Sequence, residues 1–259
     1  GGSSHEREVS LNSTAAMERA LQELGYTYYS VDLSNELDVT QHWDDSYDIV
    51  LLGFQGRAGE DGLLQATLEA NNIPFTGAGV ADSLLAFSKD ASKRQFKKYG
   101  IPTAEWELLL HERGGDLPET KLQLPYVIKP DNEGSTIGLS VCEKTEDLIE
   151  ARRVSGAFSR LIFESFIPGR ELTVGVLGNQ VLPVVEIFPG HTLYDYESKY
   201  TKGMSKYECP ANLDDALTMH IQDLAVKSMQ SVGVQVYGRV DFRLDPENQP
   251  WCLEINTLP

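Results

Sequence analysis

Two stretches near the end of the chain hold side chains that could bind a metal ion and a phosphate. Residues 237–244 and 251–256 each alternate apolar and polar side chains, which predicts two half-buried strands. The turn-forming segment 245–249 joins them, so we expect a hairpin. One face of this hairpin would hold Val240, Phe242, Leu244, Trp251, Leu253 and Ile255, and the other would hold Arg239, Asp241 and Arg243 opposite Cys252, Glu254 and Asn256.

The polar face of this hairpin predicts a magnesium site. The carboxylates of Asp241 and Glu254 and the amide oxygen of Asn256 are hard oxygen ligands of the kind that Mg²⁺ prefers. Arg239 beside them suits a phosphate group or a developing oxyanion. Taken alone, the hairpin is equally consistent with a solvated outer face that forms cross-strand ion pairs.

The first part of the chain has the pattern of an α/β layer. Predicted helices alternate with short apolar strands, which favours a parallel sheet. A glycine-rich loop, 53–62, follows one of these strands. The expected helices cover 5–25, 63–71 and 81–99, and the expected strands cover 26–31, 48–52 and 73–75.

The second part of the chain has the pattern of an α+β fold with antiparallel strands. Gly178 and Asn179 form a good two-residue hairpin turn between two of the expected strands. We expect domains over 1–80, 81–167 and 168–259. The expected strands cover 126–129, 139–142, 161–167, 171–177 and 181–187, and the expected helices cover 145–157 and 213–231.

Several further segments could contact a nucleotide. The loop 130–138 lacks the G-x-x-x-x-G-K-[ST] pattern and precedes a strand, so it is not a P-loop. A small glycine-rich loop between antiparallel strands can still donate backbone N–H groups to phosphates, with Lys129 supplying charge, although a plain surface hairpin is the alternative. The long connection 189–212 is rich in aromatic and charged residues, which is typical of a lid.

Composition excludes several classes of function. The net charge of −17 disfavours nucleic acid as a partner. No apolar run approaches the ~20 residues that span a bilayer, and no signal peptide is visible. Three cysteines without C-x-x-C spacing indicate reduced thiols and a cytoplasmic protein. The five histidines lack metal-ligand spacing, which argues against a zinc hydrolase.

The two ends of the sequence have the pattern of interrupted elements. The glycine turn at 1–4 leads into a helix, and such turns usually follow a strand, yet no strand precedes it here. The chain stops at Leu258-Pro259, directly after the polar hairpin. We therefore expect a longer natural protein that continues at both ends.

Taken together, six segments resemble the D-alanine–D-alanine ligases of the ATP-grasp superfamily, over essentially the whole chain. They are GGSSHEREVS at 1–10, GRAGEDG at 56–62, KPDNEGS at 129–135, YDYESKY at 194–200, GRVD at 238–241 and EINT at 254–257. Six motifs in order make coincidence very improbable. The resemblance implies an ATP-grasp architecture, in which an N-terminal α/β, Rossmann-like domain precedes two α+β subdomains that clasp ATP.

The resemblance also implies binding roles for individual residues. Lys89 and Lys129 would bind the α- and β-phosphates of ATP, and Lys199 would reach the γ-phosphate. The adenine slot would be formed by Glu164, which accepts from the amino group, with the backbone of Phe166 and Ile167, and Glu171 would bind the ribose. Two Mg²⁺ ions, for which Mn²⁺ could substitute, would be held by Asp241, Glu254 and Asn256.

The reaction that the resemblance implies joins two D-alanines for peptidoglycan precursor synthesis. The carboxylate of the first D-alanine takes the γ-phosphoryl group, and the amine of the second attacks the acylphosphate. Glu8 would pair with the ammonium of the first D-alanine, and Ser135 and Tyr200 would hydrogen-bond with Glu8. Arg239 would bind the tetrahedral oxyanion. Tyr200 favours a dipeptide product over D-alanyl-D-lactate.

Two departures from the family pattern leave alternatives open. Many members have histidine where this chain has Gln55, which cannot be protonated. The family also continues past Pro259 with a segment that binds the second D-alanine. The alternatives are another ATP-grasp carboxylate–amine ligase with D-serine or D-lactate as acceptor, and a nucleotide-binding module without turnover. The family is often dimeric, so a homodimer is a further expectation, with no nucleic-acid or membrane partner.

Overall fold

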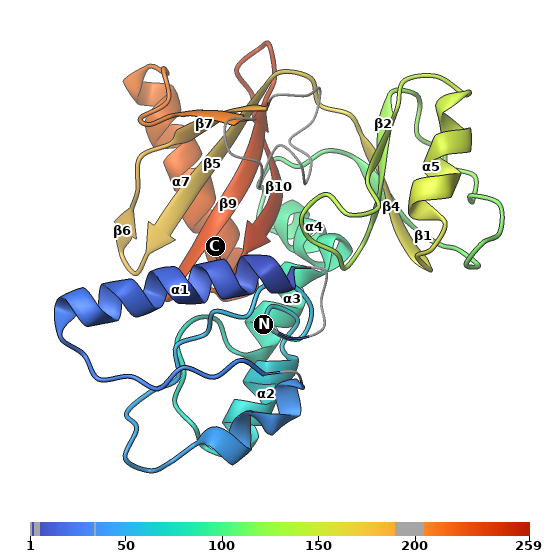
Figure 1. Cartoon of the computed structure of the whole chain (residues 1–259). Coiled ribbons are helices and arrows are strands. Elements are labelled where there is room, and N and C mark those ends of the chain that lie inside the picture. The colour runs from blue at the N-terminus through green and yellow to red at the C-terminus, as the bar shows by residue number, and fades with distance from the viewer. Residues whose placement is uncertain (1, 3–5, 34, 190–204) are drawn as a thin grey trace.

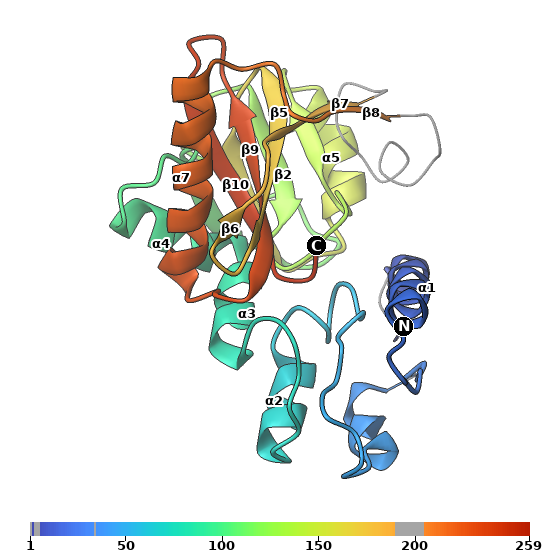
Figure 2. The same ribbon diagram turned by 90° about the vertical axis from the view of Figure 1, so that its left-hand side faces the viewer.

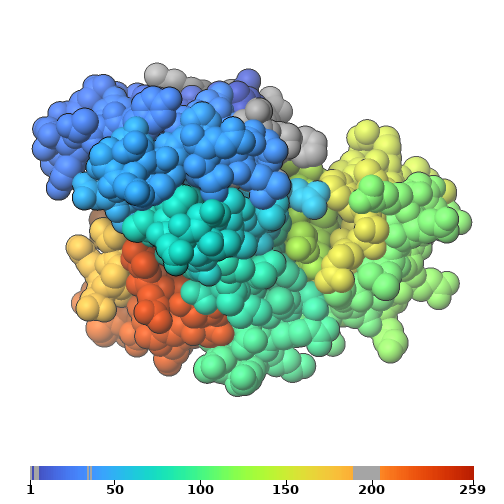
Figure 3. All heavy atoms as spheres, turned by 90° about the horizontal axis from the view of Figure 1, so that it is seen from below, coloured from blue at the N-terminus to red at the C-terminus, as the bar shows by residue number. Residues whose placement is uncertain are grey.

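The computed structural model describes residues 2, 6–33, 35–189 and 205–259. Its elements form two antiparallel sheets with helices packed on them, and an N-terminal part of helices and extended segments lies below (Figure 1). Seen from below, the part containing residues 105–160 projects as a lobe to one side (Figure 3). Three separate clusters of buried apolar side chains accompany these parts. The division into domains at residues 80 and 167 stays a prediction.

The N-terminal part contains the expected helices. Helix α1 spans Arg7–Leu24 and ends at Gly25, whose φ of 77° is left-handed and whose N–H bonds the carbonyl of Gln22. The short 3-10 helix η1 covers Glu36–His42, and α2 covers Leu63–Ala70. Leu52, Phe54, Leu64, Leu68 and Ile73 form the buried cluster here, together with Leu258 from the chain end.

One pairing of the expected parallel sheet is present among the described residues of this part, and the rest of the sheet is not. Residues 26–31 and 48–49 are extended without a ladder, and one parallel bridge, Val50 to Phe75, is the sole such pairing among the described residues. Residues of both segments line a cavity of about 690 Å³. The N–H of Gly2 donates to the carbonyl of Leu33, which also lines this cavity, at 2.7 Å.

The expected single helix over 81–99 is two helices in the structure. Helix α3 covers Val80–Phe87 and α4 covers Lys89–Lys98. Ser88 interrupts them with an extended backbone, and its hydroxyl accepts from the N–H of Ala91 as the N-cap of α4. Because of this break, α4 begins with Lys89 at its first position.

The smaller sheet has four strands in the order β1-β4-β2-β3, all antiparallel. Helix α5, Asp147–Ser155, packs on it (Figure 1). Its buried side chains include Tyr126, Ile128, Leu161 and Phe163. The strands are β1 Trp106–Leu110, which the sequence reading missed, β2 Tyr126–Pro130, β3 Ser140–Cys142 and β4 Arg160–Ser165.

The larger sheet has the order β10-β9-β5-β7-β8, with β6 paired to β5. Helix α7, Asp215–Val232, runs along one face of it (Figure 2). Leu177 pairs with Gln180 around the expected Gly178-Asn179 turn. The strands are β5 Arg170–Leu177, β6 Gln180–Val181, β7 Val185–Pro189, β8 Ser205–Glu208, β9 Tyr237–Leu244 and β10 Pro250–Asn256.

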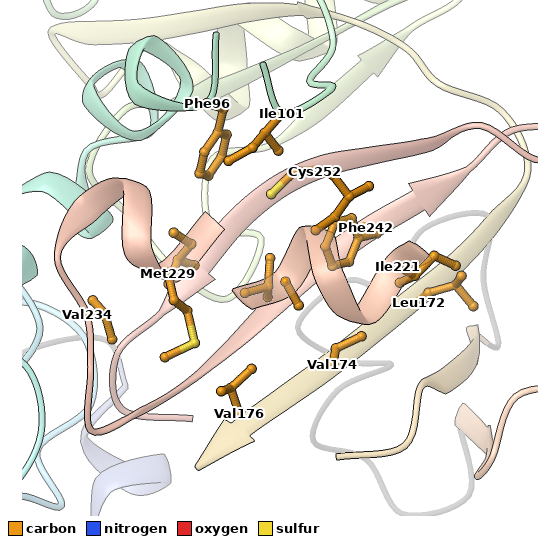
Figure 4. Close-up of a cluster of buried hydrophobic side chains, with 14 of the residues drawn as sticks. Phe96, Ile101, Leu172, Val174, Val176, Ile221, Met229, Val234, Phe242 and Cys252 are labelled. Carbon is orange, nitrogen blue, oxygen red and sulfur yellow. The ribbon is translucent and has the colours of Figure 1, made fainter. Parts of the chain in front are cut away.

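The largest core lies between this sheet and its helices (Figure 4). Leu172, Val174 and Phe242 from the strands meet Ile221 and Met229 of α7. Phe96 and Ile101, at and after the end of α4, join the same cluster. This packing fixes the position of α4 relative to β10.

A bulge in β10 overturns part of the expected alternation. Cys252 pairs with Phe242, but Glu254 pairs with Asp241, so Leu253 is an extra residue on its strand. Cys252 is therefore buried, whereas the expectation placed it on the polar face and placed Trp251 and Leu253 on the apolar one. After the bulge Glu254 and Asn256 share a face with Asp241 and Arg239, as expected.

Candidate active site

A small cavity of about 120 Å³ lies between the two sheets. Its walls come from the start of α4, β2, the loop after β2, β4, the hinge that follows β4, β5, β9 and β10. The site residues expected from the sequence that line this one cavity are Lys89, Lys129, Ser135, Glu164, Phe166, Ile167, Glu171 and Glu254. Pockets for drug-sized ligands measure roughly 300–1,000 Å³, so the cavity must open before a nucleotide enters.

The candidate metal ligands lie on the facing strands β9 and β10. Asp241 is the centre of this group: it accepts from Asn256 Nδ2 at 2.9 Å and from the Thr173 hydroxyl at 2.6 Å. The Arg239 guanidinium forms two bonds with the same carboxylate, at 3.0 and 3.1 Å. The charge of Asp241 raises the pKa of the Arg239 side chain above its ordinary value. Lys89 Nζ lies 3.3 Å from Glu254 Oε2.

This donor set fits Mg²⁺. Asp241 and Glu254 are direct partners across the hairpin. Arg239 forms an ion pair with Asp241, and Lys89 forms one with Glu254. Two carboxylates with an amide match the oxygen ligands that Mg²⁺ accepts alongside substrate phosphates. Among the described residues there is no group of three or more His, Cys, Asp and Glu side chains that could hold a metal.

Buried Asp131 places Lys89 at the cavity. The Asp131 carboxylate accepts from the Ser88 hydroxyl at 3.1 Å and from the N–H of Asp90 at 2.9 Å. Arg160 pairs with the same carboxylate at 2.9 Å. These bonds join the loop 130–138 to the start of α4. Lys89 then extends into the cavity, where its Nζ also donates to the Glu133 carbonyl at 2.7 Å.

Glu164 lies between two lysines. Its Oε1 accepts from Lys129 Nζ at 3.0 Å, and its Oε2 lies 2.7 Å from Lys93 Nζ. Burial alone would raise the pKa of Glu164, but the charges of Lys129 and Lys93 hold it below the ordinary value. The sequence reading missed Lys93, because a lysine on a charged helix usually faces solvent.

Arg243 organises the hinge after β4. Its guanidinium donates to the carbonyls of Ile167 at 3.1 Å and Gly169 at 3.0 Å. It also pairs with Glu171 at 3.3 Å and lies 5.8 Å from the centre of the Phe166 ring. The sequence placed Arg243 on the polar face of the hairpin but gave it no role. Its contacts across 72–77 residues of chain required the tertiary structure.

The expected pairing of Ser135 with Glu8 is wrong. The Ser135 hydroxyl donates instead to Glu6, whose side chain is buried, whereas Glu8 is exposed on α1. Gly134 explains this approach, because a Cβ there would lie 2.9 Å from Glu6 Oε2. Glu6 precedes α1 and so points toward the glycine-rich loop. Residues two apart on a helix face different directions, which is why Glu8 points elsewhere.

Glu60 is a further carboxylate that the sequence reading did not single out. It lies in the loop 53–62, before α2, and accepts from the N–H of Gly56 at 2.7 Å. Burial is the main cause that raises the pKa of Glu60 to about 7, and the charge of Glu6 adds to the rise. Arg239 acts in the opposite direction.

Lys199 and Tyr200 lie outside the described residues, so their expected roles at the γ-phosphate and beside Ser135 stay predictions. Gln55 is buried, and its backbone N–H donates to the Ser10 hydroxyl at 2.8 Å.

The 690 Å³ cavity of the N-terminal part is larger than the cavity between the sheets, but none of the expected site residues lines it. Eight of the expected site residues line the smaller cavity instead. No helix among the described residues is long and apolar enough to cross a bilayer.

Comparison with known proteins identifies the family of the chain. The family model described as D-ala D-ala ligase C-terminus matches residues 95–259. The D-alanine–D-alanine ligase of Aquifex aeolicus is 40% identical over 261 residues, covering 100% of this chain and 88% of that protein. The ligase of Halalkalibacterium halodurans is 43% identical, covering 100% and 87%.

Solved structures give the same answer. The D-alanine–D-alanine ligase from Bacillus anthracis superimposes with a TM-score of 0.86 at 29% identity, covering 100% of this chain and 85% of that chain. Its complex with ATP gives a TM-score of 0.83 at 26% identity, covering 100% and 84%. The ATP-grasp architecture expected from the sequence is confirmed. With a family model over most of the chain and relatives at about 40% identity over all of it, the chain belongs to the D-alanine–D-alanine ligase family.

Proposed function

We propose that this protein joins two D-alanine molecules in an ATP-dependent reaction that proceeds through an acylphosphate. One observation supports this most strongly: the candidate phosphate-binding lysines and the candidate metal ligand Glu254 line a single cavity. Glu254 is also the partner of Asp241 across the hairpin, which joins the metal group to that cavity. The product is a precursor for peptidoglycan synthesis, as the family membership implies.

The nucleotide lies between the two sheets. Lys89 and Lys129, which enter the cavity from α4 and β2, bind the α- and β-phosphates. The hinge backbone at Phe166 and Ile167 forms the adenine slot, and Arg243 keeps this hinge in place through the contacts described above. Glu171 binds the ribose, and Lys199 reaches the γ-phosphate.

Asp241, Glu254 and Asn256 hold two Mg²⁺ ions. When bound, these ions neutralise the phosphate charge and orient the transferring group. Arg239 lies beside Asp241 and stabilises the oxyanion that forms when the amine attacks. Lys89 leaves Glu254 for the phosphates when nucleotide and metal enter.

The first D-alanine binds where Glu6 meets Ser135. The Glu6 carboxylate pairs with the ammonium group of this substrate, the role that the sequence reading gave to Glu8. Ser135 holds Glu6 in place through its hydroxyl, and Tyr200 closes the site from the lid. The loop 131–138 and the lid exclude water, because the acylphosphate hydrolyses readily. A homodimer and a cytoplasmic location also stay predictions.

Two alternatives differ from this proposal in a measurable product. A ligase with another acceptor would use D-serine or D-lactate, and a nucleotide-binding module would bind ATP without turnover. The test is phosphate release from ATP and Mg²⁺ with D-alanine, D-serine, D-lactate or L-alanine, and identification of the product by mass. Phosphate release that requires D-alanine, with D-alanyl-D-alanine as product, supports the proposal. Release with a different acceptor alone supports the first alternative, and bound ADP without any release supports the second.

A further inference from the structure

Lys93 is a fully buried lysine behind the nucleotide cavity. It lies on α4, which packs against β10 and α7, and its side chain has no exposed surface. A lysine is almost never fully buried without a paired charge, because desolvating an ammonium group is costly. Burial indeed lowers the pKa of Lys93, and the charge of Glu164 opposes this shift.

The buried ammonium group of Lys93 has three partners. Nζ lies 2.7 Å from Glu164 Oε2 and donates to the Thr103 hydroxyl at 2.6 Å. It also lies 5.6 Å from the centre of the Trp106 ring, a cation–π distance. The Thr103 hydroxyl gives its own hydrogen to the Cys252 carbonyl at 2.8 Å, so it can only accept from Lys93. Lys93 is thus held in one orientation by three different elements.

The charges that line the cavity show why a buried cation behind it affects nucleotide binding. Three cations and four carboxylates form the lining, so the lining alone has a net negative charge: Lys89, Lys129 and Arg243 against Glu133, Glu164, Glu171 and Glu254. The Mg²⁺ ions proposed above would offset the charge of Glu254, whereas the carboxylate of Glu164 pairs with Lys129, a candidate phosphate-binding lysine. Lys93 lies directly behind Glu164 and offsets its negative charge without lining the cavity.

We propose that Lys93 is a positioning residue that neutralises Glu164, so that Lys129 keeps its charge for the phosphates of the nucleotide. Glu164 has two oxygens, one for each lysine. With Lys93 present, the carboxylate is shared and Lys129 is a net cation. Without Lys93, Glu164 and Lys129 form a neutral pair. This inference rests on the proposed nucleotide site but assigns a residue that does not touch the ligand.

The test compares the affinity for ADP with Mg²⁺ and for adenosine, by equilibrium binding. Lys93→Met removes the charge and keeps most of the volume, and we expect ADP affinity to fall about 10- to 100-fold, the range typical of outer-shell partners. Adenosine has no phosphate, so its affinity should change by less than about threefold, about 0.7 kcal/mol. Lys97→Met, on the exposed side of the same helix, is the matched control.

A second substitution should reverse the first. In the Lys93→Met background, Glu164→Gln removes the carboxylate that then pairs with Lys129, while the amide oxygen can still accept from adenine. We expect the double variant to bind ADP within about threefold of the Glu164→Gln single variant. A scaffold role for Lys93 predicts the contrary, a further loss when a second buried polar group is changed.

The outcomes separate the inference from the proposed function. Equal losses for ADP and adenosine in Lys93→Met, or a double variant that binds ADP more than about threefold more weakly than Glu164→Gln, would overturn the role of Lys93. Failure of the wild-type protein to bind ADP would overturn the nucleotide site itself. If Lys93→Met does not fold, Thr103→Val and Thr103→Ser give the comparison: the hydroxyl that orients the ammonium is lost only in the first. Equal ADP affinity in these two variants would then overturn the inference.

Discussion

Replacing Glu6 by glutamine tests the correction that the structure makes to the substrate site. The hydrogen bond between Ser135 and Glu6 holds this carboxylate against the loop 130–138, with 9% of the Glu6 residue exposed. In the proposed reaction it pairs with the ammonium group of the first D-alanine. A hydrogen bond to a charged group contributes about 1.5–3 kcal/mol, and each 1.36 kcal/mol is a factor of ten. We therefore expect kcat/KM for D-alanine to fall about 10- to 150-fold in Glu6→Gln.

Glu8→Gln is the matched control for this experiment. Glu8 is exposed on α1, and surface substitutions usually change free energies by less than about 0.5 kcal/mol, or about twofold. The assay is phosphate release at varied D-alanine and saturating ATP, with ADP affinity measured in parallel as evidence of an intact nucleotide site. An equal loss in both variants, or a larger loss in Glu8→Gln, would refute the assignment of Glu6.

Four further predictions concern other parts of the molecule. The raised pKa of Glu60, about 7, means that the folded protein keeps a proton that the unfolded chain releases above its ordinary value of 4.5, so stability falls as pH rises between these values. Glu60→Gln should therefore gain stability relative to wild type between pH 5 and pH 8, by about 1–3 kcal/mol in denaturant unfolding; a constant difference would contradict the shift. Asp241→Asn should raise the Mg²⁺ concentration needed for nucleotide binding about tenfold or more, measured as ADP binding during a Mg²⁺ titration, and an unchanged requirement would exclude Asp241 as a ligand. Lys199→Ala should abolish phosphoryl transfer while ADP still binds, and equal turnover would refute its role at the γ-phosphate. Phe242→Ala, in the fully buried core, should lower the free energy of unfolding by about 3–5 kcal/mol, and a loss below about 1 kcal/mol would mean that this core is less tightly packed than the structure shows.

The sequence predicted most of the secondary structure and the family. The Gly178-Asn179 turn and the helix that ends at Gly233 depend on local chemistry, namely positive φ at glycine and apolar spacing, so they can be inferred from a short window. Asp241 and Glu254 share a face because strand periodicity places them there. Ordered motifs along the chain identified the family without any coordinates.

Other features could not be read locally. The break between α3 and α4 at Ser88 follows from the side chain of Asp131, which is 43 residues away in the chain. The bulge at Leu253 moves Cys252 to the core, although period-two alternation predicts the opposite. The expected strand at 26–31 has the right residue types but pairs with no other strand among the described residues, and 48–52 forms only the Val50–Phe75 bridge, because a strand needs a partner backbone within hydrogen-bonding distance along its length.

The sequence by itself therefore determined the chemical types at the site: hard oxygens for a metal, lysines for phosphates and a glycine-rich loop that can approach a ligand closely. Only the tertiary structure decided which polar and charged side chains of the site lie close enough to pair. It paired Ser135 with Glu6 rather than Glu8, and it set Lys93 against Glu164 in the interior. The reason is physical, since the energy of a charge depends on its burial and on neighbours a few ångströms away, and those neighbours come from distant parts of the chain.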